Sequence, residues 1–276
     1  MRAVLVTAPV RPDVANEDFA AVTPSAAVLL DGAGIPDGMD SGCVHGVAWF
    51  ARTLGTVLLA KISAAYSGSL ADCLHDSLVA VRSLHGGACD LVHDGSPSAT
   101  VVAVRIRGDE LEHLVLSDSV LVLAGSSADV TVVADGRIAE AARPHRGDLD
   151  RMPIGTPGRA AALRAYIQTV RGMKNTPDGF WVASADPEAA RYALTGSTPL
   201  ASLRAVLLLS DGASRLTDLF ALASWDELVS LVLESGPAEV IRRVRAAEAS
   251  DPDGTRWKRG KAVDDATVVC CDQFTT

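Results

Sequence analysis

The sequence lacks a long hydrophobic run. Its longest apolar helix candidate, Val44–Ile62, is interrupted by His45, Arg52 and Lys61, whereas a membrane-spanning helix needs about 20 consecutive apolar residues. The opening residues MRAVLVTAPVRPD meet proline and charge too early for a secretory signal peptide. We therefore expect a protein of the cytoplasm that makes no membrane contact.

Cysteines and histidines at the usual metal-binding or catalytic spacings are also missing. The five cysteines form no CxxC pair, and the six histidines show no HxH or HExxH spacing. A disulfide framework, a zinc cage and zinc catalysis are therefore not expected. The adjacent Cys270 and Cys271 should point to opposite faces of a strand. Because no GxSxG motif occurs, the sequence offers no signature of a nucleophilic serine.

Positive charge is in short supply. The chain carries 25 Lys and Arg against 34 Asp and Glu, a net charge of -9. This balance disfavours nucleic acid as a partner, because phosphate backbones are bound by basic surfaces. A phosphorylated substrate stays compatible with it if a bound cation inverts the local potential.

What the sequence does contain is an ample apolar fraction, 48% of 276 residues, which suits one domain spanning residues 1–276. Short β-branched runs predict strands at Ala3–Val6, Ala26–Leu30, Thr100–Ile106, Leu111–Leu116, Val120–Leu123, Val130–Val133, Val206–Leu209 and Ala266–Cys271. Helical patterns cover Cys43–Ser63, Ala71–Leu84, Arg159–Arg171, Pro187–Thr195, Trp225–Ser235 and Pro237–Ala249. Strands clustered in this way favour an α+β fold over a doubly wound parallel sheet. The stretch from Asp135 to Gly158, rich in Arg, Pro and Gly, begins a variable flap that we place at residues 135–180.

Acidic residues recur in the turns next to apolar strands. They occur in Asn16-Glu17-Asp18, Leu30-Asp31-Gly32, Ser117-Asp118-Ser119, Ser210-Asp211-Gly212 and Asp264-Asp265. Each motif alone is a turn signal first, so the stretch LLDGAG (Leu29–Gly34) could be a turn, a phosphate loop or a metal site. Strand ends converge on one rim of a sheet, where such carboxylates can meet. Oxygen ligands of this kind suit Mg²⁺ or Mn²⁺.

The order of these motifs resembles a known family, the metal-dependent protein serine/threonine phosphatases of the protein phosphatase 2C type. The family pattern runs from an ED pair through a DGxGG loop, an AT strand hairpin with GDS, and an SDG strand end to a terminal DN-x-T strand. The collinear counterparts here are NED (16–18), LLDGAG (29–34), ATVVAVRIRGDELEHLVLSDSVLVL (99–123), LLLSDGASRLTD (207–218) and DDATVV (264–269). The resemblance implies a four-layer αββα sandwich in which two antiparallel β-sheets are flanked by helix pairs.

The resemblance also implies a set of site residues and a mechanism. Asp31 would bridge two Mn²⁺ or Mg²⁺ ions, Gly32 would offer its carbonyl, and Asp211 and Asp264 would complete the cage. A metal-bridging water held through Asp31, Asp211 and Asp264 would attack phosphorus directly, without a covalent enzyme intermediate. Glu17 and Asp18 would act from the same rim. Asp118 would help to hold a third ion, for which Asp178, or else Asp186, is the candidate partner acid.

Several positions depart from the family pattern. The arginine that grips the phosphate usually lies four residues before the Glu, where this chain has Asp13, so Arg11 is the candidate phosphate ligand. The metal loop reads DGAGIPDG, without the second paired glycine, and GDS and DN have become SDS and DD.

These features support a monomeric Mn²⁺- or Mg²⁺-dependent phosphatase acting on phosphoserine or phosphothreonine in proteins. The departures leave two alternatives open. One is a regulatory binding protein that keeps the fold and turns over little, and the other is a phosphatase for a small phosphorylated metabolite.

Overall fold

The computed structural model describes residues 1–33, 39–64, 67–127 and 129–274. Within these residues the strands form two antiparallel five-stranded sheets. One sheet has the order β1 (Arg2–Ala8), β10 (Ala266–Asp272), β9 (Leu203–Leu209), β6 (Val120–Gly125) and β7 (Val130–Val133). The other has the order β2 (Phe19–Thr23), β3 (Ala26–Leu30), β4 (Val101–Arg107), β5 (Glu110–Leu116) and β8 (Leu194–Pro199).

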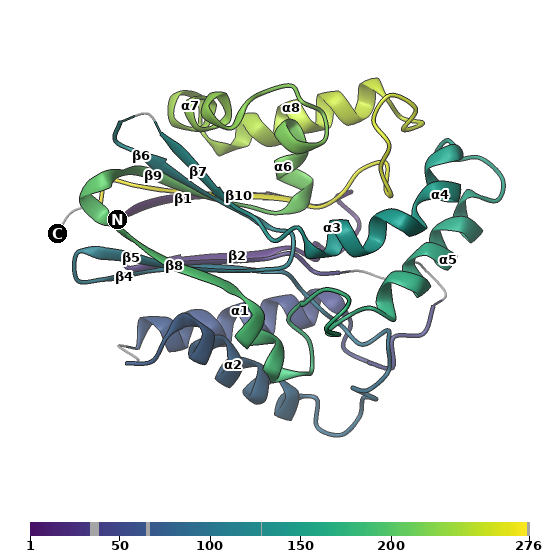
Figure 1. Ribbon diagram of the computed structural model, residues 1–276, viewed down its shortest axis with the longest axis horizontal. Coiled ribbons are helices and arrows are strands. Elements are labelled where there is room, and N and C mark those ends of the chain that lie inside the picture. Colours follow the sequence, from purple (N-terminus) through teal and green to yellow (C-terminus); the bar gives the residue numbers. More distant parts are fainter. Residues whose placement is uncertain (34–38, 65–66, 128, 275–276) are drawn as a thin grey trace.

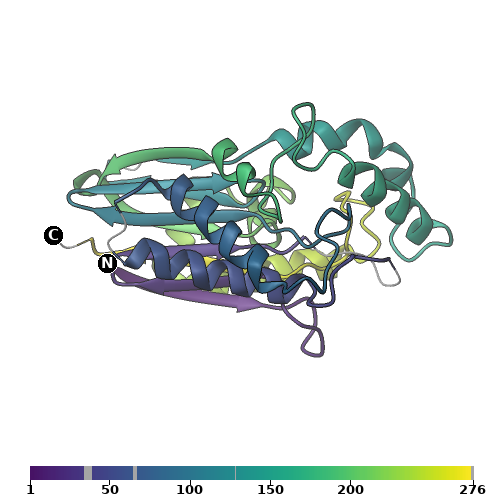
Figure 2. The same cartoon turned by 90° about the horizontal axis from the view of Figure 1, so that it is seen from below.

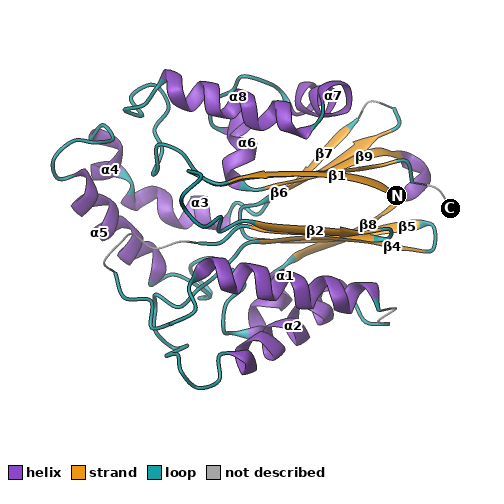
Figure 3. Ribbon diagram, turned by 180° about the vertical axis from the view of Figure 1, so that it is seen from behind, coloured by secondary structure: helices purple, strands orange, loops and turns teal. Residues whose placement is uncertain are grey.

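Helices cover the outer face of each sheet, which gives four layers (Figures 1 and 3). The β2–β8 sheet carries α1 (Val47–Ser63) and α2 (Leu70–Leu84), whose position across the sheet is visible from below in Figure 2. The β1–β7 sheet carries α6 (Asp211–Asp218), α7 (Trp225–Ser235) and α8 (Pro237–Ser250). The predicted αββα sandwich is therefore confirmed. None of the described helices combines the length and apolar character needed to cross a bilayer.

Alternating side chains build the core. Leu208 of β9 and Val104 of β4 point between the two sheets, whereas Leu207 points toward α6–α8. Successive strand residues point to opposite faces, and both faces of these strands are covered, so the strands read as continuous apolar runs. The same alternation places Cys271 between the sheets and Cys270 under the helices, as expected.

Some elements differ from the sequence prediction. The predicted helix at Pro187–Thr195 is a short 3₁₀ segment, Pro187–Tyr192, followed by strand β8. Strand β2 and helix α6 were not predicted, because the two alanines of FAAVT weaken its strand signal and DGASRLTD begins like a turn. The expected flap contains three helices, α3 (Arg137–Ala142), α4 (Gly147–Arg151) and α5 (Arg159–Arg171), at the end of the molecule opposite the termini (Figure 1).

Two glycines allow strand ends to approach one another closely. A Cβ at Gly212 would lie 1.9 Å from the carbonyl oxygen of Asp265, and one at Gly32 would lie 2.7 Å from that of Glu17. Real side chains do not tolerate such separations from backbone atoms. The glycines of Asp31-Gly32 and Asp211-Gly212 are therefore required by packing between segments, beyond any role in a local turn.

Replacing Gly212 by alanine should push the start of β10 away from α6. We expect Gly212→Ala to lower the free energy of unfolding by about 1–3 kcal/mol, as overpacking does in tight interiors. Gly136→Ala is the control, because Gly136 has a φ of -79° and nothing lies within 4 Å of its added Cβ; it should change stability by less than about 0.5 kcal/mol. Denaturant unfolding measures both, and equal stability of the two variants would contradict the close packing.

Candidate active site

The register of the β1–β7 sheet brings three acidic turns to one end. Leu209 of β9 lies opposite Val268 of β10 and Val120 of β6. The segments that follow β9 and precede β10 and β6 therefore leave the sheet together. These segments carry Asp211, Asp264 and Asp118.

The acidic residues of the second sheet lie at the same end of the molecule as those of the first. Phe19 of β2 pairs with Leu30 of β3, so Asp18 and Asp31 lie at the joined ends of these strands. The backbone N–H of Asp211 donates to Oδ2 of Asp31 at 3.3 Å, which links the two sheets at this rim. The sequence-predicted acidic residues thus come together although up to about 250 positions separate them in the chain.

A cavity of about 830 Å³ opens at this rim. One wall is acidic and contains Glu17, Asp31, Gly32, Asp118, Asp211 and Asp264. The other wall comes from α3, α5 and the adjoining turns, and combines apolar side chains such as Ile138 and Ile167 with Arg143, Arg146, Arg171 and Lys174. The local sequence does not identify these basic residues as part of the site, because only the tertiary fold brings the 135–180 segment over the acidic rim.

Loss of hydration, and to a smaller extent neighbouring negative charge, raises the pKa values of Asp18, Asp31 and Asp118. Loss of hydration raises the pKa of Asp31 well above its ordinary value, and Asp18, Asp211 and neighbouring carboxylates raise it further. Loss of hydration and the charge of Asp211 raise the pKa of Asp118 to about 6. Burial likewise raises the pKa of Asp18 to about 7, against the hydrogen bond from Thr267. Each shift reports that negative charge here is poorly compensated by the protein alone.

The acidic wall fits a hard divalent cation. Its donors are carboxylate and carbonyl oxygens, the ligands that Mg²⁺ and Mn²⁺ prefer. Asp18 is buried, its Oδ2 accepts from the Thr267 hydroxyl at 2.7 Å, and its Oδ1 has no hydrogen-bond partner among the described residues. A buried carboxylate oxygen without a partner is costly, and a cation would supply the missing interaction.

Asp264 differs from the other carboxylates because two cationic side chains already bind it. Lys261 Nζ donates to Oδ1 at 2.7 Å, and Arg215 Nη2 donates to Oδ2 at 2.7 Å. Arg215 is held in turn by the buried Glu248 on α8, at 2.9 Å. A cation approaching Asp264 therefore competes with Lys261 and Arg215 for the same oxygens.

The neighbouring Asp265 binds backbone groups of a loop. Its two carboxylate oxygens accept hydrogen bonds from the backbone N–H groups of Val10 and Glu17, at 2.7 and 2.8 Å. The Asp265 side chain thus fixes the loop that precedes β2 and positions Glu17 at the rim. The resemblance to the family singled out Asp264 as the ligand of this pair, and residue type alone does not distinguish it from Asp265.

Four of the predicted residues do not line the cavity: the buried Asp18, and Arg11, Asp178 and Asp186. Arg11 is exposed and its Nε donates to Asp13 at 3.4 Å. Asp178 is exposed in a turn before Phe180, and Asp186 caps the 3₁₀ segment by accepting from the Glu188 N–H at 3.0 Å. The altered IPDG part of the acidic loop, residues 35–38, lies outside the described residues.

No protein-family model matches this sequence, and no curated protein matches it significantly. Solved structures do match along nearly the whole chain. The serine/threonine phosphatase PstP/Ppp of Mycobacterium tuberculosis is 15% identical, with 99% of each chain covered and a TM-score of 0.58. The PPM Ser-Thr phosphatase MsPP from Mycobacterium smegmatis, in complex with cacodylate, is 18% identical, with 99% of each chain covered and a TM-score of 0.56.

A further match carries metal. The catalytic domain of the serine threonine protein phosphatase PstP, in complex with two manganese ions, is 17% identical, with 98% of this chain and 97% of that chain covered and a TM-score of 0.56. At such identities the likeness concerns the arrangement of the chain. This protein has the fold of the PPM, or protein phosphatase 2C type, serine/threonine phosphatases.

Proposed function

We propose that this protein is a metal-dependent phosphatase that hydrolyses phosphoserine or phosphothreonine in a protein substrate of the cytoplasm, and that it acts as a monomer. The observation that carries the proposal is the meeting of acidic residues from five separate segments at one cavity wall. Carboxylates gathered from unrelated turns, with raised pKa values, are typical of a functional site.

The residues of the acidic wall would hold the ions. Asp31, Asp211, Asp264 and the Gly32 carbonyl would bind two Mn²⁺ or Mg²⁺ ions, with Glu17 and Asp18 beside them, and Asp118 would serve a third. When bound, these ions would supply an activated water for direct attack on phosphorus and would neutralise the phosphate charge. Asp18 is oriented for this by Thr267, and Glu17 by Asp265.

The basic wall suits the substrate. Lys174 is held by the carbonyls of Asp94 and Ser96, and burial, with the nearby Arg171, lowers its pKa to about 8, so it stays largely cationic at neutral pH. Arg146 is fixed by Asp150 and lies over the Tyr166 ring. These cations would attract a phosphorylated segment toward the acidic wall, since charge of one sign in a cleft steers charge of the other.

Activity should depend on divalent metal and on Asp211. We expect the protein to hydrolyse p-nitrophenyl phosphate and a phosphothreonine peptide with Mn²⁺, and to lose activity with a chelator. Asp211→Asn should lower kcat/KM at least about a hundredfold, because even residues behind the metal ligands cost about 10–100-fold. The matched control is Asp226→Asn, at an exposed carboxylate in the first turn of α7, which should leave activity unchanged.

Hydrolysis that survives chelation, or that Asp211→Asn leaves intact, would contradict the proposal. A substrate panel separates the classes of substrate. Turnover of phosphorylated metabolites without turnover of phosphopeptides would favour the metabolite phosphatase instead.

A second candidate is a regulatory protein that binds a phosphoprotein with little turnover. The observation that favours it is the occupation of both Asp264 oxygens by Lys261 and Arg215, together with Asp13 at the position of the family's arginine. Both features weaken the catalytic set and leave the fold intact. Calorimetry that finds tight phosphopeptide binding with negligible turnover over many substrates would support this candidate.

Removing Lys261 tests the competition at Asp264. Lys261→Met should tighten Mn²⁺ binding by a factor of about 1.4 to 5, because a half-exposed ion pair is worth about 0.2–1 kcal/mol. Lys258→Met, at an exposed lysine of the same loop, controls for the loss of one positive charge and should have a smaller effect. Isothermal titration calorimetry with MnCl₂ measures both. Weaker or unchanged binding in Lys261→Met would show that Lys261 does not compete with the ion.

A further inference from the structure

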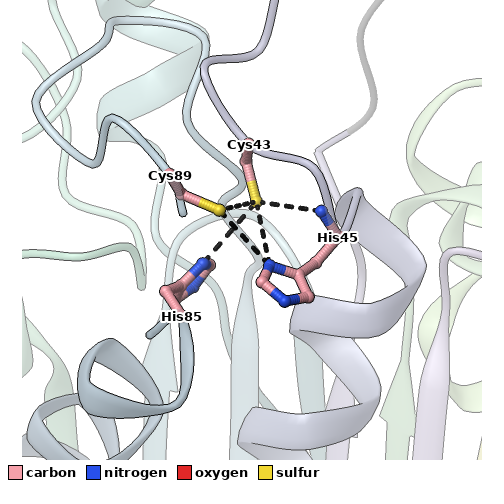
Figure 4. A group of neighbouring side chains, drawn as sticks. All are labelled: Cys43, His45, His85 and Cys89. Atoms are coloured by element: carbon pink, nitrogen blue, oxygen red, sulfur yellow. Dashed lines mark hydrogen bonds between the residues drawn. The ribbon is translucent and has the colours of Figure 1, made fainter. Parts of the chain in front are cut away.

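A second cluster of ligand-type side chains lies apart from the acidic wall. Cys43 and His45 precede α1, whereas His85 and Cys89 follow the last turn of α2 (Figure 4). One ligand atom from each of the four side chains lies within 4.8 Å of all the others. His85 is buried and the other three are half-buried, so two distant segments bring four metal-binding groups together in a partly enclosed place.

Four of the six separations between these ligand atoms are close to those of a tetrahedral zinc site. With Zn–S of about 2.3 Å and Zn–N of about 2.0–2.1 Å, such a site has S···S edges of about 3.8 Å and S···N edges of about 3.6 Å. Here the two Sγ atoms are 3.4 Å apart, and Cys43 Sγ lies 3.8 and 3.6 Å from Nδ1 of His45 and His85. Cys89 Sγ lies 3.3 Å from Nδ1 of His45. One ion fits at the centre of these atoms.

The surroundings orient the ligands. The Trp49 ring stacks on His45 at 4.2 Å between centroids and meets His85 edge-on at 4.9 Å, which fixes both imidazoles. The backbone N–H of His45 donates to Cys43 Sγ at 3.4 Å, a bond that favours a thiolate. The N–H of Asp90 donates to the carbonyl of Gly42 at 2.7 Å, so the backbones of the two segments are already joined.

We propose that Cys43, His45, His85 and Cys89 bind one structural zinc ion. Two thiols and two imidazoles select zinc over the hard cations suited to the acidic wall. Because the protein supplies all four ligands, no position is left open for a substrate, and the site is structural.

This ion would join residues 39–46, which precede α1, to the loop that runs from α2 to β4. That loop carries the cavity residues Asp94, Ser96 and Ser98. Zinc would hold residues 39–46 against the α2–β4 loop at the end of α2. The sequence rules that excluded a zinc cage missed this cluster, because its ligand pairs, Cys-x-His and His-x₃-Cys, stand 40 positions apart.

The test is metal analysis of the full chain purified with a reductant. We expect one zinc per chain by elemental mass spectrometry. Replacement by Co²⁺ should give thiolate-to-cobalt charge transfer in the near ultraviolet and the strong visible bands of tetrahedral Co²⁺, neither of which an all-oxygen site produces. Cys43→Ser and Cys89→Ser should lose the zinc and the charge-transfer band.

Matched controls use the same residue types elsewhere on α2. Cys73→Ala, in the helical core, and His75→Asn should keep one zinc and the Co²⁺ spectrum. Asp211→Asn should keep both as well, which separates this site from the acidic wall.

Three results would overturn the proposal. The first is a wild-type protein with free thiols that neither retains zinc nor shows the Co²⁺ charge-transfer band. The second is zinc that persists in the Cys43→Ser/Cys89→Ser double variant. The third is a Cys43–Cys89 disulfide in the metal-free protein under the same reducing conditions. The first and third use the wild-type chain, so they decide the question even if the serine variants fail to fold.

Discussion

Carboxylates that lie close together in a poorly hydrated cavity repel one another, and the architecture of this protein depends on which groups compensate that repulsion. Loss of hydration raises the pKa values of Asp18, Asp31 and Asp118, and neighbouring carboxylates raise them further, so the fold alone compensates this negative charge incompletely. Arg215 and Lys261 neutralise part of the charge at Asp264. Under the proposed function, cations from solution would compensate the rest, and metal binding would then be linked to the integrity of this end of the sandwich. Strand register, the two Asp-Gly pairs and the Asp265 side chain all serve to hold the repelling groups in place.

Much of this fold could be predicted from local sequence. The bounds of β3 and β7 and of helices α5 and α7 were predicted to the residue, because apolar runs mark the strands and Gly or Ser stands beside each end of the helices. Strand β8 could not be predicted, because LTGSTP contains glycine, proline and polar residues, and only its pairing with β5 makes it a strand.

The site divides in the same way. The acidic residues were predicted from ordered motifs, since each follows or precedes a strand whose register sends it to the rim. Arg11 and Asp178 were predicted to act at the rim, but the structure does not bring them to it. The direction of an exposed side chain in a loop depends on neighbours that the local sequence does not reveal. Asp264 and Asp265 show the limit most clearly. Two identical side chains in succession differ in role because one faces the cavity and the other faces the backbone of a loop 248 positions away.

The pairing of the first and last strands has a practical consequence. Arg2 of β1 lies opposite Asp272 of β10, and the two side chains form an ion pair, so the chain enters and leaves the sandwich at adjacent points. Both points lie at the end remote from α3, α5 and the cavity (Figure 1). A tag, a fusion partner or a surface linker attached at either terminus would therefore leave the mouth of the cavity open. A short bridge between the start of β1 and the end of β10 would also be sterically simple, which makes this chain a suitable starting point for circular permutation.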